Sequence, residues 1–110
     1  MNSSIVIALP KIDDAKKIRA ILNRHGFSVA AVCSTASTAL ASMSELDGGI
    51  LICGYKLTDR YYRDVLEDIP SYFEMLLLAS GRVIAEAPTS VLTVEMPMKV
   101  SDLVNTVDMM

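Results

Sequence analysis

The stretch Gly49-Ile50-Leu51-Ile52-Cys53-Gly54-Tyr55-Lys56-Leu57 decides the fold class of this chain. Its centre, residues 50–53, is a short continuous apolar run with turn-forming residues on both sides. Such a run predicts a strand buried on both faces of a parallel sheet. In open α/β sheets the functional crevice lies just beyond the carboxyl ends of such strands. Gly54 stands at that end, and glycine has no side chain that can act as acid, base, nucleophile or metal ligand.

Four other apolar runs predict the remaining strands, at residues 4–9, 27–33, 74–79 and 90–95. The segments between them have the apolar spacing of helices, with Ile12, Ala15, Ile18, Ile21 and Leu22 on the inner face of the first. The segment 82–87 is long enough for only a turn or two of helix, because Pro88 follows. We expect Gly26 to end the first helix. The predicted caps are Ser34 or Thr35 for the second helix, Thr58 for the third and Ser101 for the last.

A strand followed by a helix thus occurs five times along the chain. This alternation predicts an α/β fold, a flavodoxin-like (βα)5 three-layer sandwich with a parallel sheet in the order 2-1-3-4-5 and a shortened fourth helix. At 110 residues the chain is expected to form one domain, residues 1–110. The last helix stops without a glycine cap or a breaker, so we expect the domain to be the N-terminal part of a longer regulator.

Composition excludes several classes of function. The net charge is −3 and no stripe of Lys and Arg is present, so we expect no direct contact with nucleic acid. Cys33 and Cys53 end apolar runs and are predicted to be buried thiols, and no spacing of Cys and His suggests a metal. The single histidine, His25, has no partners for a catalytic triad. Neither a signal peptide nor a membrane-spanning run is visible, so we expect a cytoplasmic protein without a membrane contact.

Several short strings resemble the receiver (CheY-like) domain of bacterial response regulators over essentially the whole chain. Gly26-Phe27 is similar to the glycine–aromatic pair before the second strand, and residues 51–59 resemble the segment around the phosphorylated aspartate. Met96-Pro97-Met98 is similar to the Lys-Pro-Phe after the fifth strand, and Ser101-Asp102-Leu103 to the start of the last helix. The resemblance implies the flavodoxin-like fold and a role in two-component signal transduction.

The same resemblance implies that the phosphorylation pocket is degenerate. Receivers hold Mg²⁺ with two acidic residues after the first strand, accept the phosphoryl group on an aspartate, and use a Ser/Thr and a lysine around it. The corresponding positions here are Leu9 and Pro10, Gly54, Ala79 with Ser80 as its neighbour, and Met96. We therefore predict a pseudoreceiver that has no cofactor and is not an enzyme.

A narrower resemblance points to the receiver-like half of ANTAR-type antitermination regulators. It rests on Ile52-Cys53-Gly54-Tyr55-Lys56-Leu57, the shortened fourth helix and residues 96–110. In that family the last receiver helix continues into a coiled coil and a small RNA-binding domain, so RNA would be contacted only by a C-terminal domain outside this chain. The function implied is protein–protein association, as a homodimer formed through the region of the fourth and fifth strands and helices.

Two alternatives remain open. In the first, the domain senses a small molecule in an apolar remnant of the pocket, lined by Leu9, Pro10, Tyr55, Ala79 and Met96. In the second, it is phosphorylated on a relocated acceptor, Asp59, although a role in the turn before the third helix is the simpler interpretation. Asp13 and Asp14 are interpreted as complements of a helix dipole. A candidate partner or ligand surface comprises Tyr55, Tyr61, Tyr62, Pro97 and Met98.

Overall fold

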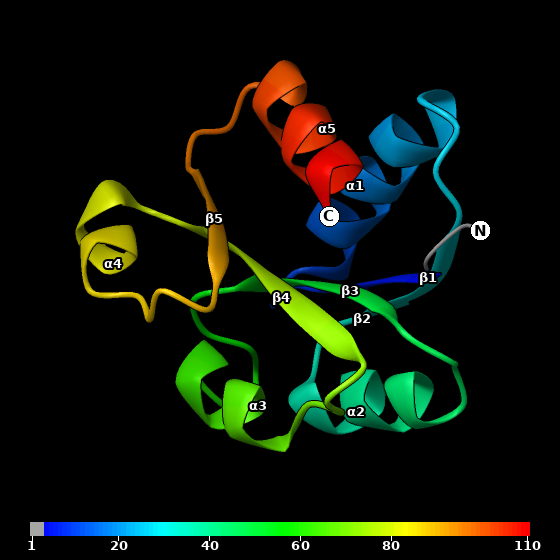
Figure 1. The fold of residues 1–110 in the computed structure, drawn as a ribbon, viewed down its shortest axis with the longest axis vertical. Helices are drawn as coiled ribbons and strands as arrows, with labels where there is room; N and C mark the ends of the chain where they lie inside the picture. Colours follow the sequence, from blue (N-terminus) through cyan, green and yellow to red (C-terminus); the bar gives the residue numbers. More distant parts are fainter. Residues whose placement is uncertain (1–3) are drawn as a thin grey trace.

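A computed structural model describes residues 4–110 and contains five pairs of a strand and a helix (Figure 1). In chain order the elements are β1 (Ser4–Ala8), α1 (Ile12–Arg24), β2 (Val29–Cys33), α2 (Ala36–Ser44), β3 (Gly49–Gly54), α3 (Tyr62–Asp68), β4 (Phe73–Ala79), α4 (Gly81–Ala85), β5 (Leu92–Glu95) and α5 (Val100–Met109). All neighbouring strands pair in parallel, in the order β2-β1-β3-β4-β5. The predicted flavodoxin-like architecture and strand order are therefore confirmed.

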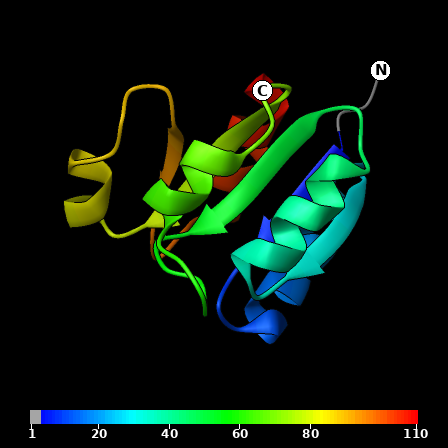
Figure 2. The same ribbon diagram turned by 90° about the horizontal axis from the view of Figure 1, so that it is seen from below.

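The helices form layers on the two faces of the sheet. In Figure 1, α1 and α5 lie above the sheet and α2 and α3 lie below it. Figure 2, a view from below, shows α2 and α3 in front of the strands, with the short α4 set off to one side beyond β5. The three-layer sandwich and the shortened fourth helix are as predicted.

Each face of the sheet carries its own apolar core, because successive strand residues point to opposite faces. The α2–α3 side buries Val6, Ala8, Leu51, Cys53, Met75, Leu77, Met43, Tyr62 and Val65, among others. The α1–α5 side buries Ile5, Ile7, Ile50, Ile52, Leu76, Leu78, Ile18, Leu22, Leu103 and Val107. The central strands β1, β3 and β4 are buried on both faces, which is why their sequences read as continuous apolar runs.

Two of the predicted helix boundaries are confirmed by their hydrogen bonds. Gly26 has φ +86° and ends α1: its N–H donates to the Asn23 carbonyl, and that of Phe27 donates to the Leu22 carbonyl. This pair of bonds defines a Schellman motif, which needs a left-handed residue at that position. At the start of α2, the Thr35 hydroxyl accepts from the Thr38 N–H at 3.1 Å.

The other two predicted caps are wrong. α3 begins at Tyr62 and not after Thr58, because residues 55–62 first form a tight turn in which the Leu57 N–H donates to the Arg60 carbonyl at 2.7 Å. Leu57 is buried by this turn, and the Thr58 hydroxyl donates to the Ser34 carbonyl instead. α5 begins at Val100, one residue before the predicted Ser101 cap, with no side-chain capping bond.

One predicted core residue also lies outside the core. Ile12 was expected on the inner face of α1, but its side chain is 37% exposed. It occupies the first position of the helix, where the chain is still leaving the sheet edge, and Ala15, Ile18 and Leu22 are the residues of α1 that are buried.

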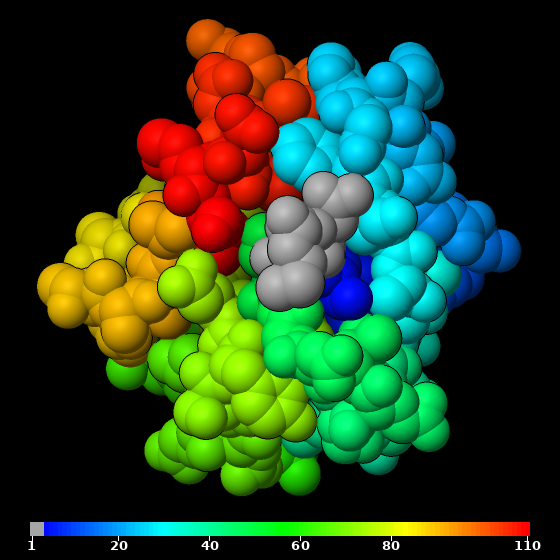
Figure 3. All heavy atoms as spheres, turned by 45° about the vertical axis from the view of Figure 1, so that its right-hand side comes forward, coloured from blue at the N-terminus to red at the C-terminus, as the bar shows by residue number. Residues whose placement is uncertain are grey.

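The last turn of α5 lies at the molecular surface. Figure 3 shows it in red beside the cyan and light-blue segment that joins α1 to β2. Phe27, Val29 and Met110 pack around the same apolar core. Among residues 4–110, none of the helices combines the length and the apolar character needed to cross a membrane.

Candidate functional site

Gly54 is the last residue of β3 and lies beside the carboxyl end of β1. This residue is buried, and Leu9 and Pro10 lie over it from the end of β1. A Cβ atom added to Gly54 would stand 3.0 Å from Leu9 Cδ2 and 3.6 Å from Pro10 Cδ. A side chain at position 54 would therefore begin in contact with apolar groups, Leu9 closest.

The residues that lie over Gly54 are apolar and carry no charge. Leu9 is 8% exposed, and residues 4–110 bury no charged or polar side chain. Within that same range, no group of three or more His, Cys, Asp or Glu side chains is arranged to hold a metal ion. A divalent cation needs oxygen ligands, and the residues around Gly54 offer none from their side chains.

Cys53, which precedes Gly54, is the nearest side chain with nucleophilic potential. It is buried, and its thiol donates to the Gly54 carbonyl at 3.3 Å. Burial raises the pKa of this thiol to about 12, because a thiolate would be desolvated. Cys53 is therefore protonated at neutral pH, which suits a structural residue and not a nucleophile. Cys33 is likewise a buried free thiol, as predicted.

Ala79 is the last residue of β4, Ser80 follows it, and Met96 follows β5. Ala79 is buried, and its carbonyl accepts from the Met96 N–H at 2.8 Å. Ser80 is exposed at the start of α4 and makes no capping bond with its side chain. The Glu95 carboxylate lies over this start, since a Cβ atom on Gly81 would stand 2.9 Å from Glu95 Oε2. Met96, which the sequence resemblance aligns with the lysine of receivers, is apolar and 41% exposed.

An apolar hollow, which we call the α1 groove, opens beside this edge on the α1 side. Its volume is about 370 Å³, and it is lined by Leu9, Pro10, Asp14, Lys17, Ile18, Ile21, Leu78, Met96 and Met98. Of the residues expected to line an apolar remnant, Leu9, Pro10 and Met96 do so, whereas Tyr55 and Ala79 do not. Met98, from the candidate partner surface, also lies here. Its neighbour Pro97 is exposed and does not line the groove.

Three of the four tyrosines, Tyr55, Tyr61 and Tyr62, gather on the opposite side of the sheet, in a second hollow between α3 and α4. This tyrosine hollow has a volume of about 330 Å³ and is lined by Tyr55, Tyr61, Tyr62, Arg63, Arg82, Val83 and Glu86. The rings of Tyr55 and Tyr61 meet edge to face, with centroids 5.3 Å apart. Tyr62 is buried and belongs to the core, so only Tyr55 and Tyr61 present much of their rings to solvent.

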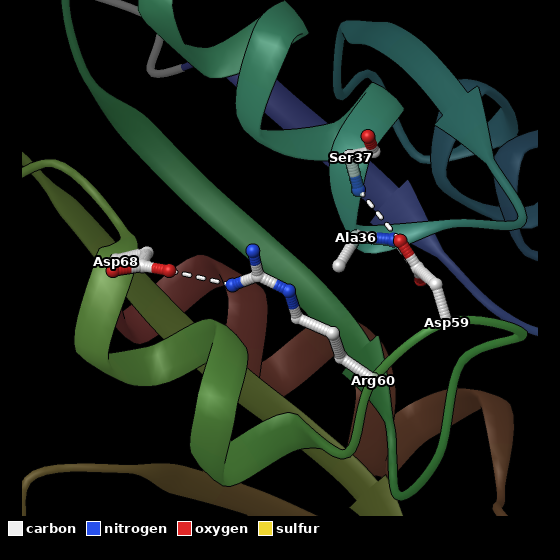
Figure 4. A network of polar contacts seen from close by, with 5 residues as sticks. All are labelled: Ala36, Ser37, Asp59, Arg60 and Asp68. Atoms are coloured by element: carbon white, nitrogen blue, oxygen red, sulfur yellow. Dashed lines mark hydrogen bonds and ion pairs between the residues drawn. The ribbon is translucent and has the colours of Figure 1, made fainter.

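Asp59 holds the β3–α3 connection against α2 (Figure 4). Its carboxylate accepts from the Ala36 N–H at 2.7 Å and from the Ser37 N–H at 3.1 Å. These bonds, the Ala36 bond foremost, lower the pKa of Asp59. The neighbouring Arg60 points the other way and pairs with Asp68 on α3. Asp59 thus lies in the turn before α3, as expected, but its carboxylate caps α2.

Several lining residues are not among those that the sequence predicts for a site. Asp14, Lys17, Ile21 and Leu78 line the α1 groove, and Arg63, Arg82 and Glu86 line the tyrosine hollow. Their helical spacing predicts which face of a helix they share, but which strand end they approach depends on the packing of α1 and α4 on the sheet. Asp59 caps α2 through Ala36 and Ser37, which precede it by 23 and 22 positions. No local sequence pattern indicates such a contact.

Solved structures with a similar fold include response regulators and their receiver domains. A CheY-like receiver domain from Methylobacillus flagellatus matches with a TM-score of 0.82 at 13% identity, covering 99% of this chain and 98% of that one. The response regulator PhyR from Brucella abortus matches with a TM-score of 0.79 at 17% identity over 98% of this chain. This chain has the fold of a receiver domain.

The receiver fold is also found in a matching structure described as an adenylate cyclase from Rhodopirellula baltica, with a TM-score of 0.85 at 16% identity over 99% of this chain and 87% of that one. The chain spans 46% of the length of the Brucella PhyR chain. No protein-family model matches the sequence, and no curated protein matches it. At such identities the likeness concerns the fold alone, and function must be argued from the site.

Proposed function

We propose that this domain is a non-catalytic regulatory pseudoreceiver, which works by protein–protein association and not by phosphoryl transfer. The observation that carries the proposal is the filling of the acceptor position. Gly54 lies beneath Leu9 and Pro10, so the strand end that would present a carboxylate presents an apolar contact. Phosphoryl transfer needs a nucleophile, a metal and groups that stabilise developing charge, and the residues at these positions supply none from their side chains.

Incubation with Mg²⁺ and acetyl phosphate tests this part of the proposal. We expect the intact mass of the protein to remain unchanged, and an increase by one phosphoryl group would contradict it. The same experiment decides the alternative acceptor, Asp59. Both oxygens of that carboxylate accept backbone hydrogen bonds from α2, which supports a structural role for Asp59.

Association as a homodimer is supported by exposed apolar side chains in the β5–α5 region. Leu92, Met96 and Val100 are all large, apolar and exposed within nine residues of one another. Contiguous exposed apolar surface favours association, and these three residues are proposed to form part of such a surface. Sedimentation equilibrium tests the dimer, and charged substitutions at Leu92 and Val100 are expected to weaken it. A monomer at all concentrations would contradict this step.

The output is proposed to be RNA-linked antitermination through a C-terminal domain, in line with the ANTAR-like strings of the sequence. The acidic net charge of −3 supports assigning RNA contact to another domain. We expect the full-length protein to bind RNA and this domain alone not to bind it, measured by fluorescence anisotropy. RNA binding by residues 1–110 alone would contradict the assignment.

The α1 groove favours a second candidate function, the sensing of a small molecule. Its volume of about 370 Å³ lies within the ~300–1,000 Å³ range of small-ligand sites. It also lies at the carboxyl edge of the sheet, where open α/β folds bind ligands. A ligand would raise the melting temperature by mass action, so thermal shift against a metabolite panel tests this candidate. No shift with any compound would count against it.

A further inference from the structure

The α1 groove has an apolar body and a charged rim. Ile18, Ile21 and Leu78 line its apolar body, together with Met96 and Met98 from the β5–α5 connection. Methionine side chains are unbranched and polarisable, so they adapt to the shape of an apolar ligand. Because Met96 is 41% exposed, a ligand here would remove apolar surface from water, which favours binding.

The rim carries one charge of each sign. Asp14 and Lys17 lie three positions apart on α1, a spacing that places both side chains on the same face of the helix. Both residues are exposed, and within residues 4–110 neither takes part in an ion pair. A ligand whose only charge is a carboxylate would be attracted by Lys17 but repelled by the negative charge of Asp14. A zwitterionic ligand would complement both.

We propose that the α1 groove binds an apolar α-amino acid, whose side chain contacts Ile21, Met96 and Met98 while its ammonium and carboxylate groups lie beside Asp14 and Lys17. The inference rests on the second candidate function, ligand sensing. It shares Met96 with the surface proposed above for association, but neither Leu92 nor Val100 lines the groove. In an α-amino acid the ammonium group, the carboxylate and the side chain are all attached to one carbon atom. The two charges can therefore lie at the charged rim of the groove while the side chain enters the adjoining apolar body.

A titration with leucine, followed by NMR of protein labelled on its methionine methyl groups, tests the proposal. We expect the signals of Met96 and Met98 to shift with saturation. Met109 is exposed outside the groove and Met43 is buried on the other side of the sheet, so their signals should stay in place. Two relatives of leucine test the head group: 4-methylpentanoate lacks the ammonium, and 3-methylbutylamine lacks the carboxylate. Each is expected to bind about two- to fivefold more weakly, the size of an exposed charge interaction.

Matched variants on α1 test the rim. Asp14→Asn and Lys17→Gln should each weaken leucine binding by about two- to fivefold. Asp13→Asn and Lys16→Gln, which change the same charges at exposed residues outside the groove, should leave it unchanged. Equal binding of leucine and 4-methylpentanoate would overturn the amino-acid class while leaving a ligand site. Shifts absent from Met96 and Met98 with all three compounds would overturn both, and the acetyl phosphate experiment would still judge the pseudoreceiver separately.

Discussion

Gly54 ends a central strand of a receiver-like fold without a side chain that can react. Leu9 and Pro10 lie over it, so its surroundings are apolar as well. A carboxylate introduced at this position would be buried among apolar groups with no cation beside it. Restoring the aspartate alone is therefore expected to damage the domain and not to restore phosphorylation.

We predict that Gly54→Asp lowers the free energy of unfolding by about 3 kcal/mol at pH 7, the typical cost of an uncompensated buried charge. Gly54→Ala is the control and should cost about 1 kcal/mol, because its Cβ meets only the flexible end of Leu9 at 3.0 Å. Urea unfolding measures both. The difference should shrink at acid pH, since a protonated carboxyl is cheaper to bury. Equal stability of the two variants would show that the position is open to solvent.

Gly49 is required for a different reason, a close approach between backbones. It has φ +156°, and a Cβ atom there would stand 1.8 Å from the Ser4 carbonyl oxygen of the neighbouring strand. We predict that Gly49→Ala costs about 3 kcal/mol or more, since β1 or β3 must shift. Gly26→Ala is the comparison: φ is +86° but no atom lies within 4 Å of the added Cβ, so about 1 kcal/mol is expected. Thermal unfolding that ranks Gly26→Ala as the more damaging would contradict this account.

The β3–α3 connection is hydrogen-bonded to the start of α2 and to the residue before its cap. Its turn buries Leu57, while Thr58 donates to the Ser34 carbonyl and Asp59 caps the helix. The connection thus begins at Gly54 and is fixed by hydrogen bonds to Ser34 and to the start of α2.

We predict that Asp59→Ala lowers the free energy of unfolding by about 1 kcal/mol at neutral pH, the typical value of a helix cap. The hydrogen bonds to Ala36 and Ser37 lower the pKa of Asp59 in the folded protein. Its stabilising contribution is therefore complete above the ordinary pKa of aspartate and is lost as the pH falls through the lower folded value. Urea unfolding across that acidic range should show the two proteins converging.

Asp47→Ala serves as the control for this experiment. Asp47 is exposed, and its side chain makes no hydrogen bond within residues 4–110. Its removal should have little effect on stability at either pH. A constant gap between the wild type and Asp59→Ala down to the lowest pH would mean that the carboxylate does not cap α2.

The sheet and its layers could be predicted from the sequence because each strand is a local apolar run. Residues 50–53 and 75–79 are buried on both faces, so their composition alone indicates central strands of a parallel sheet. The Gly26 and Thr35 boundaries were predictable because their capping bonds join neighbours. The predicted Thr58 cap failed because the β3–α3 turn is held by Ser34 and α2, segments that no local window includes.

The candidate site was predictable only where it follows strand ends. Leu9, Pro10 and Met96 were placed together because the carboxyl ends of parallel strands share one edge. Tyr55 was expected to join them, but the chain after β3 turns toward the α3 side, and Tyr55 lines the tyrosine hollow. Which helix residues complete a hollow depends on how α1 and α4 pack, and the sequence pattern does not determine that.

The central claim is that phosphoryl chemistry is absent from a domain that keeps the receiver fold. Mass spectrometry of the intact protein after incubation with acetyl phosphate and Mg²⁺ tests it most directly, with a phosphorylatable receiver domain treated in parallel as the positive control. The account predicts an unchanged mass for this protein and for its Asp59→Ala variant. A stable gain of one phosphoryl group would contradict it, and loss of that gain in Asp59→Ala would identify Asp59 as the acceptor.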